Sequence, residues 1–303
     1  ELLEFRARET PKVLLEESAA AHVLVQSHTL TSGGSDLACS VGGYRMTVFG
    51  TARDGKRSSS FNETSGAAHD LRERHVADCF GIGEMLRDTE RQIETQPIGA
   101  KFTGEVVLMP NAVADLLEWL HGQIGDVQLI AGSSLYRNKV GAMIASPLVS
   151  LRSRFDAPGV AAVSADAFVT PPVEVLRDGR LMTLTPSLYA SRKTGLAHVP
   201  VAPAGWEMGA GTTPRSELAA GIVRGAWVGR LSMGNPASNG DFSGVIKNSF
   251  VISDGRLGPA LSETMISGNI GQMLRDVVAV SHERIDTGAL QLPWLRVANL
   301  HYS

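Results

Sequence analysis

The sequence predicts an α+β protein that has mixed, largely antiparallel β-sheets, a few helices and a β-rich C-terminal half. Three observations lead to this prediction. From Gly221 onward, β-prone segments follow one another with a single helical stretch between them. Upstream, helices and strands do not alternate in the regular way that a doubly wound parallel sheet requires. Glycine is frequent, with 32 residues, whereas aromatic residues make up only 6%, and this composition suits a fold with many tight turns.

Composition limits the classes of partner. The 303 residues are 43% hydrophobic, which is enough for one large domain or two smaller ones. The 28 Lys and Arg nearly balance the 31 Asp and Glu without a long run of one sign, so no nucleic acid or anionic membrane is expected as a partner. Two isolated cysteines, Cys39 and Cys79, cannot make a disulfide framework, and they indicate a reducing compartment, for which the cytoplasm is the expectation.

The N-terminal portion, residues 1–100, is predicted to hold two strands and a long helix. Glu1 to Glu9 is typical of an amphipathic helix, not of a signal peptide. The predicted strands are Ala21–Gln26 and Tyr44–Phe49, the second followed by a turn at Asp54-Gly55. Apolar residues at helical spacing predict one long helix over Gly66–Ile93, with an interruption around Gly81-Ile82-Gly83.

The C-terminal portion, residues 101–303, begins with a strand at Glu105–Met109 and a helix at Ala112–His121. That helix has Leu116, Leu117 and Leu120 on one face. A hairpin follows at Val173–Leu184, with its turn at Asp178-Gly179, and then a short helix at Ser187–Lys193. The later predicted elements begin with strands at Ile222–Leu231 and Gly244–Ser253, the second followed by a hairpin turn at Asp254-Gly255. A strand at Glu263–Ile266, a helix at Ile270–Val280 capped by Asn269, and a last strand within Leu295–Leu300 follow.

Four ordered blocks in the C-terminal portion carry a family resemblance. Asn235-Pro236-Ala237-Ser238-Asn239-Gly240-Asp241-Phe242-Ser243 resembles the Asn-Pro-x-Thr/Ser-Gly-Asp-Phe-Ser signature of TldE/PmbA proteins, with one extra residue around Asn239. The other blocks are Leu188–Gly195, Gly244–Phe250 and Thr264–Ile270. By their order and spacing, the chain is identified as similar to the TldD/TldE (PmbA) peptidase family, as a TldE-type member. The family's N-terminal α/β region is missing, and because the sequence does not begin with Met, it is expected to start downstream of a natural start.

The resemblance implies a subunit without a cofactor of its own. The family's other subunit, TldD, is a zinc peptidase whose His-Glu-x-x-x-His helix supplies two imidazoles and a glutamate, with a distant cysteine as third ligand. Here the corresponding helix reads Ala-Asp-Leu-Leu-Glu-Trp-Leu-His-Gly-Gln from Ala114 to Gln123, with no His before Glu118, and no cysteine follows Cys79. The expectation is therefore no metal in this chain, and zinc in a TldD-type partner.

Five residues are candidates for a site. Glu118 and His121 lie one helical turn apart and, with Asp241, are the candidate catalytic residues; the alternative for the first two is a polar pair at the rim of the helix. Asn235, Asp241 and Ser243 are candidates for lining a substrate chamber, and the alternative is a turn whose side chains cap backbone groups.

His75 and Cys79 share a helical i,i+4 spacing that suits two zinc ligands, but their apolar neighbours favour buried packing.

Three hypotheses for function follow. The favoured one is a non-catalytic, metal-free subunit that pairs with a TldD-type zinc subunit and helps it act on unfolded peptides or peptide natural-product precursors. The second is a stand-alone hydrolase or other bond-cleaving enzyme on the same scaffold. The third is a non-enzymatic binding module, most simply a homodimer that uses its sheet edges.

Overall fold

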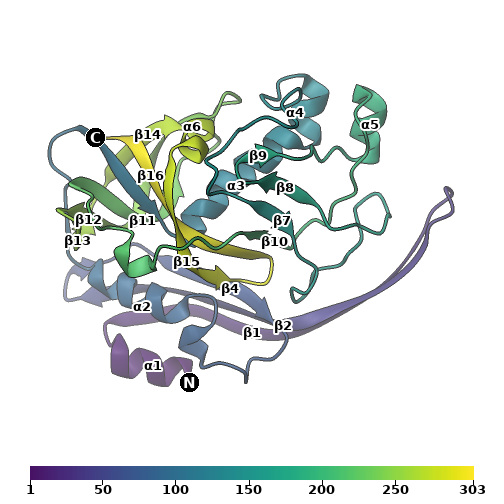
Figure 1. The fold of residues 1–303 in the computed structure, drawn as a ribbon. Helices are drawn as coiled ribbons and strands as arrows, with labels where there is room; N and C mark the ends of the chain where they lie inside the picture. The colour runs from purple at the N-terminus through teal and green to yellow at the C-terminus, as the bar shows by residue number, and fades with distance from the viewer.

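Two β-sheets hold most of the regular secondary structure, and the computed structural model describes residues 1–303 (Figure 1). The smaller sheet has four strands, all drawn from the first 68 residues, and the larger sheet has twelve. Most strand pairs are antiparallel, and nine of the strands of the larger sheet come after residue 170. The predicted α+β class with a β-rich C-terminal half is confirmed. No helix is both long and apolar enough to cross a membrane.

The smaller sheet is dominated by one long hairpin, β1 (Val13–Leu30) with β2 (Asp36–Asp54). Its two strands pair as far as Leu30 and Asp36, with one register shift between Leu15 and Glu17, and its outer half projects away from the body (Figure 1). β4 (Asn62–Ala68) pairs only with the inner half of β2, and β3 is Arg57–Ser58. The predicted strands Ala21–Gln26 and Tyr44–Phe49 are therefore parts of much longer strands, because the pairing of β1 with β2 continues well beyond these segments.

The predicted long helix over Gly66–Ile93 is wrong. This segment contains the end of β4, a 3₁₀ turn at Val76–Asp78 (η1) and helix α2 (Ile82–Arg91). Phe80 and Gly81 have φ of 53° and 73°, and two successive left-handed residues end any continuous right-handed helix. The ring of Phe80 lies against Gly66, where an added Cβ would be 2.2 Å from Phe80 Cδ1. The apolar residues whose spacing predicted one helix face are thus divided between a loop and α2, and both pack on the smaller sheet.

A closed ring of five strands forms the centre of the larger sheet. β6 (Phe102–Leu108) pairs in parallel with β11 (Arg224–Ser232), and antiparallel pairing continues through β12 (Asp241–Ser253), β14 (Thr264–Asn269) and β16 (Leu290–Tyr302), which returns to β6. Helix α3 (Pro110–Ile124) packs against β11 and β16. Its buried side chains belong to the largest hydrophobic cluster of the protein.

The remaining elements lie outside this ring. The strands are β5 (Thr95–Gln96), β7 (Leu151–Ser153), β8 (Glu174–Arg177), β9 (Arg180–Leu181), β10 (Trp206–Met208), β13 (Arg256–Leu261) and β15 (Val277–Asp286), and the helices are α1 (Leu2–Glu9), α4 (Asp126–Ala131), α5 (Leu188–Thr194), α6 (Ile270–Arg275) and the 3₁₀ turn η2 (Arg215–Glu217).

Several predicted local features are confirmed. The Asp178-Gly179 and Asp254-Gly255 pairs both have positive φ at each residue, as type I′ hairpin turns require. Asn269 caps α6, since its Oδ1 accepts a hydrogen bond of 3.0 Å from the Gln272 backbone N–H. However, α6 ends at Arg275 and not at Val280, because the chain from Val277 onward pairs with β16.

We expect Gly66→Ala to destabilise the protein by about 1–3 kcal/mol, because the added methyl group must displace the buried ring of Phe80. Urea unfolding would measure the change. The matched control is Gly122→Ala on α3, where a Cβ meets open space and alanine should be neutral or stabilising by up to about 1 kcal/mol. Equal stability of the wild type and Gly66→Ala would contradict the packing described here.

Candidate functional site

Helix α3 presents a polar stripe along one side. Asp115, Glu118 and His121 recur every three residues, and this spacing places them on one face of a helix. The opposite side of α3 is buried, which fixes how the helix is rotated and keeps the stripe out of the core. The buried side chains are Ala112, Val113, Leu116, Leu117, Leu120 and Ile124. The hydrophobic pattern of α3 therefore positions its three titratable groups.

One side of the stripe faces a groove of about 650 Å³, which we name the α3 groove. Asp115, Glu118 and His121 form one wall, and half of the twenty lining residues are hydrophobic. The opposite wall comes from loops near 164–166, 185–187 and 199–206, together with the start of β16. A groove of this size, with apolar walls and a few charged groups, suits a small molecule or a short extended peptide segment.

A second groove, of about 470 Å³, lies on the other side of the stripe. Its far wall is the loop Met233–Ser238, so we name it the loop groove. Asp115 and Glu118 line both grooves. These two carboxyl groups therefore form an acidic ridge between the grooves.

His121 is held as a neutral imidazole. Burial lowers the pKa of His121 to about 4, and its ring packs 4.7 Å from that of Trp206, measured between centroids. Its Nε2 atom is buried and has no hydrogen-bond partner. His121 consequently carries no charge at neutral pH, and it can offer only one imidazole nitrogen to a ligand in the α3 groove.

Asp115 is a site residue that the sequence analysis missed. Burial raises its pKa to about 6, although the Leu231 N–H donates a hydrogen bond of 3.4 Å to Oδ2 and opposes that shift. Glu118, one turn further on, is exposed and makes no ion pair. The i,i+3 spacing from Asp115 to Glu118 is visible in the sequence, but only the tertiary packing shows that Asp115 is the more buried of the two.

The structure separates Asp241 and Ser243 from this stripe. The Asp241 carboxylate accepts hydrogen bonds of 2.8 Å from the side-chain amides of Asn269 and Asn239. Both bonds lower the pKa of Asp241, and the bond from Asn269 has the larger effect. The same contacts tie the signature loop to the start of α6. Ser243 is exposed on β12 opposite Ser267, and neither Asp241 nor Ser243 lines either groove. Asn235, by contrast, lines the loop groove.

The far wall of the α3 groove is braced by carboxylates distant in sequence. Asp126 accepts hydrogen bonds from the Ser187 N–H at 2.8 Å and from its hydroxyl at 2.5 Å. Asp166 accepts one from the Leu188 N–H at 2.8 Å and lies 3.3 Å from His198 Nε2. These contacts fix the start of α5 beside the groove. No sequence pattern predicts these contacts, because each joins residues at least 22 positions apart.

No three His, Cys, Asp or Glu side chains are grouped so that they could hold a metal ion. His75 and Cys79 flank η1 instead of sharing one α-helical face, so the spacing argument for a ligand pair fails. His75 Nδ1 accepts a hydrogen bond from the Ala77 N–H, and Cys79 is buried.

Comparison with known proteins identifies the family. A family profile described as the PmbA/TldA metallopeptidase C-terminal domain matches residues 102–303, more than half of the chain. The chain belongs to the PmbA/TldD family. No curated protein sequence matches it.

Three solved structures share the fold. TldE from Thermococcus kodakarensis is 18% identical with a TM-score of 0.82, and the match covers 100% of this chain and 72% of that one. A candidate modulator of DNA gyrase from Thermotoga maritima is 19% identical with a TM-score of 0.81 and the same coverage. A second candidate modulator, from Bacteroides thetaiotaomicron, is 20% identical with a TM-score of 0.85, covering 99% and 70%. At these identities the likeness shows the fold.

We expect His121→Phe to reduce the loss in the free energy of unfolding that occurs as the pH falls from 6.5 to 4. The pKa of His121 is about 4 in the folded protein and about 6.5 when unfolded, so the unfolded state gains a proton first as pH falls. The contribution of neutral His121 to the free energy of unfolding is therefore fully present above pH 6.5, and up to about 3 kcal/mol of it is lost towards pH 4. Phenylalanine keeps a ring against Trp206 but cannot titrate. Urea unfolding between these pH values would measure both proteins, and parallel curves would contradict a neutral His121.

Proposed function

We propose that this chain is the metal-free, TldE-type subunit of a TldD/TldE-type zinc peptidase complex, and that it helps to hold unfolded peptides or peptide natural-product precursors for cleavage. The observation that carries this proposal is the composition of α3. The helix that supplies two zinc-binding imidazoles in TldD has here one imidazole, His121, and two carboxylates, Asp115 and Glu118.

The chemistry of hydrolysis supports a non-catalytic role. A zinc peptidase needs three protein ligands, so that the metal can lower the pKa of a bound water to about 7. His121 is a single buried imidazole, and no cysteine follows Cys79 to act as a distant ligand. The groups along α3 can hydrogen-bond or attract a substrate, but they do not make up such a ligand set.

The grooves beside α3 support a role in holding peptide. Apolar side chains of the α3 groove, such as Val199, Val201 and Leu290, can accept apolar substrate side chains. The acidic ridge of Asp115 and Glu118 favours amino groups, whether an N-terminus or a lysine. An unfolded peptide offers both kinds of group along one strand.

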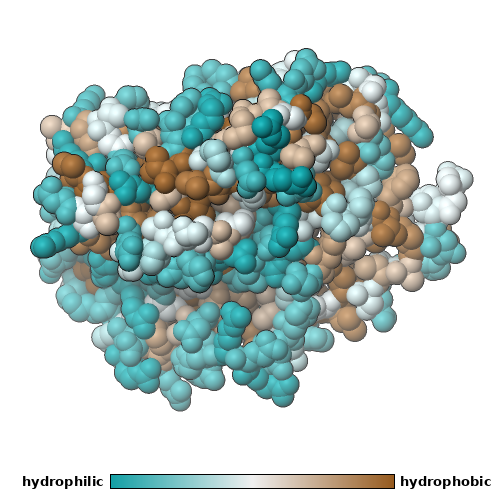
Figure 2. All heavy atoms as spheres, in the orientation of Figure 1, coloured by the Kyte–Doolittle hydropathy of each residue, from teal (hydrophilic) through white to brown (hydrophobic).

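The β1–β2 hairpin supports assembly with a partner subunit. β1 pairs with β2 alone, so one edge of an 18-residue strand is unpaired, and the strand has no proline or lysine to protect that edge. Between Ser18 and Tyr44, Asp36 is the only Asp, Glu, Lys or Arg. Leu24 and Val25 are 61% and 48% exposed, and Figure 2 shows brown and white residues beside teal ones on the projecting arm. A two-stranded ribbon is marginal alone in water, so we propose that the TldD-type subunit packs on it.

A stand-alone hydrolase is the second candidate function. Asp115, with a pKa of about 6, and the neutral imidazole of His121 line one groove, and acid–base catalysis uses groups whose pKa values are shifted in this way. In that case Asp115→Asn or His121→Phe would abolish turnover by the purified chain, whereas Asp241→Ala would not, because Asp241 lies outside the groove.

Metal analysis combined with a peptide-cleavage assay distinguishes the two candidates. We expect the purified chain to contain no stoichiometric zinc and to cleave no unfolded peptide, because it lacks the ligand set. After it is mixed with a TldD-type subunit, the complex should contain zinc and cleave peptide until a chelator is added. Stoichiometric zinc in this chain alone, or any cleavage of peptide by it alone, would refute the proposed role, and cleavage that a chelator does not stop would favour the stand-alone hydrolase.

We expect Leu24→Lys and Val25→Lys to weaken binding of the TldD-type subunit at least tenfold, because each places a charge in a surface that assembly would desolvate. Analytical ultracentrifugation or a titration of the two subunits would give the dissociation constants. Val223→Lys is the matched control, since Val223 is 74% exposed on the body of the protein. Unchanged affinity in both hairpin variants would show that the partner binds elsewhere.

A further inference from the structure

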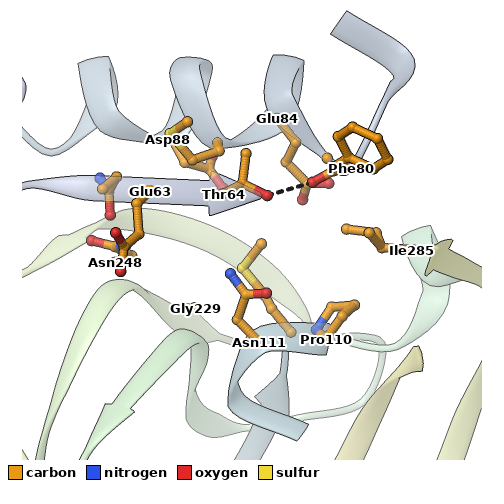
Figure 3. Close-up of a pocket in the computed structure, with 14 residues that line it drawn as sticks. Glu63, Thr64, Phe80, Glu84, Asp88, Pro110, Asn111, Gly229, Asn248 and Ile285 are labelled. Carbon is orange, nitrogen blue, oxygen red and sulfur yellow. Dashed lines mark hydrogen bonds between the residues drawn. The ribbon is translucent and has the colours of Figure 1, made fainter. Parts of the chain in front are cut away.

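A pocket at the start of α3 is too small to hold a peptide. It lies between the N-terminal sheet and the strand ring, where α2 and β4 face the first turn of α3 (Figure 3). Its volume is about 50 Å³, which is room for one or two waters. The α3 groove and the loop groove are far larger, at about 650 Å³ and 470 Å³. A peptide that contacts α3 therefore lies in these grooves.

The far wall of the loop groove is fixed to α3 by two hydrogen bonds. Gln123 Nε2 donates one of 2.8 Å to the Ser238 carbonyl. Trp119 Nε1 donates a longer one, of 3.4 Å, to the Ala237 carbonyl. Both bonds hold the loop beside the helix without help from a ligand. A peptide consequently enters a groove whose two walls are already in place.

No lysine or arginine lines either groove, although four carboxyl groups do. Asp126 and Asp166 accept hydrogen bonds from the start of α5. The ridge carboxyls of Asp115 and Glu118 are less engaged, since Asp115 accepts one bond of 3.4 Å and Glu118 is exposed. His121 is neutral and adds no compensating charge. A groove with this one-sided charge attracts cationic groups and repels anionic ones.

Gly122 leaves the backbone of α3 uncovered in the loop groove. It lies one helical turn after Glu118, and an added Cβ would meet nothing within 4 Å. Alanine would fit at this position and would favour the helix, so packing gives no reason for glycine here. Glycine does allow the backbone of a ligand to approach the helix closely. This observation is independent of the charge on the ridge, and it points to an occupant of the loop groove.

The dimensions suit a short extended segment. Asp115 and Gly122 are seven residues apart on α3, which is about 10 Å along the helix axis and the length of about three residues of an extended chain. Half of the residues that line the α3 groove are hydrophobic, whereas only four of the fourteen in the loop groove are. A peptide can therefore keep its backbone in the polar loop groove and place an apolar side chain in the α3 groove.

We propose that the two grooves select peptides in which a positively charged amine lies next to an apolar side chain. The amine, of a lysine or of the amino terminus, lies on the ridge of Asp115 and Glu118. The apolar side chain enters the α3 groove, and the peptide backbone passes over Gly122. Acidic segments are rejected, because the ridge repels them. This inference rests on the peptide-holding role proposed above and gives that role a substrate preference.

The test is calorimetric titration of the purified chain with short, C-terminally amidated Gly/Ser peptides at neutral pH, where the carboxyl group of Asp115, with a pKa of about 6, is mostly ionised. One acetylated peptide carries Leu-Lys, a second carries Leu-norleucine, which keeps the aliphatic chain without the amine, and a third carries Leu-Glu. A fourth has leucine and a free amino terminus but no lysine. We expect the norleucine peptide to bind at least about fivefold more weakly than the best of the amine-bearing peptides, and the glutamate peptide more weakly still.

Two variants separate the charge from the backbone contact. Glu118→Gln should weaken binding of the amine-bearing peptides and leave the norleucine peptide unchanged. Gly122→Ala should weaken all of them at least about fivefold, while urea unfolding shows a stability equal to that of the wild type or higher. Glu263→Gln is the matched control, since it makes the same change in net charge at an exposed residue outside both grooves, and it should leave every affinity unchanged.

Equal affinities for the lysine, free-amine and norleucine peptides would overturn the preference and leave the holding role intact. No binding of any peptide would overturn both. Unchanged affinity in Gly122→Ala would place the peptide outside the loop groove, and an equal effect of Glu263→Gln would show that net charge selects the peptide; either result overturns the proposal. Zinc in the chain alone would refute the proposed complex without changing these affinities, so the two failures are distinguishable. The stronger of the two amine-bearing peptides identifies the source of the amine.

Discussion

Closure of the strand ring is the constraint on which the C-terminal part of this protein depends. Because β6, β11, β12, β14 and β16 each pair on both sides within the ring, their register and position are fixed by hydrogen bonds that no edge interrupts. Helix α3 follows β6 after a single residue and packs its leucines onto this ring. The rotation of α3, and with it the direction of Asp115, Glu118 and His121, follows from that packing.

The same helix explains how a peptidase scaffold can keep its shape with different chemistry. The core requires only the apolar side of α3, so the residues of the polar stripe are free to differ without loss of the fold. Here that stripe carries a neutral imidazole and two carboxylates between two grooves. The loop from Asn235 to Asp241, which carries the most distinctive family sequence, forms a wall of one groove and is anchored through Asn269. In our proposal the shape of the site is retained for peptide while the catalytic metal belongs to the partner subunit.

The N-terminal part is joined to the ring by different means. Its hairpin extends beyond the body, whereas α2 and β4 meet the ring across a polar pocket instead of a continuous apolar contact. The left-handed Phe80 belongs to the same junction, since its carbonyl accepts the bond from Thr64 and its ring covers Gly66.

The sequence by itself determined the features that short-range chemistry controls. These are the α+β class, helix α3, the type I′ turns at Asp178-Gly179 and Asp254-Gly255, the Asn269 cap and the ordered blocks that indicate the family. Only the tertiary structure decided the features that depend on contacts between distant segments. Gly66–Ile93 has helical periodicity, yet packing against the sheet divides it into a strand end, a 3₁₀ turn and α2. Likewise, burial against Trp206 makes His121 neutral and burial raises the pKa of Asp115, because desolvation arises from neighbours that no local pattern specifies.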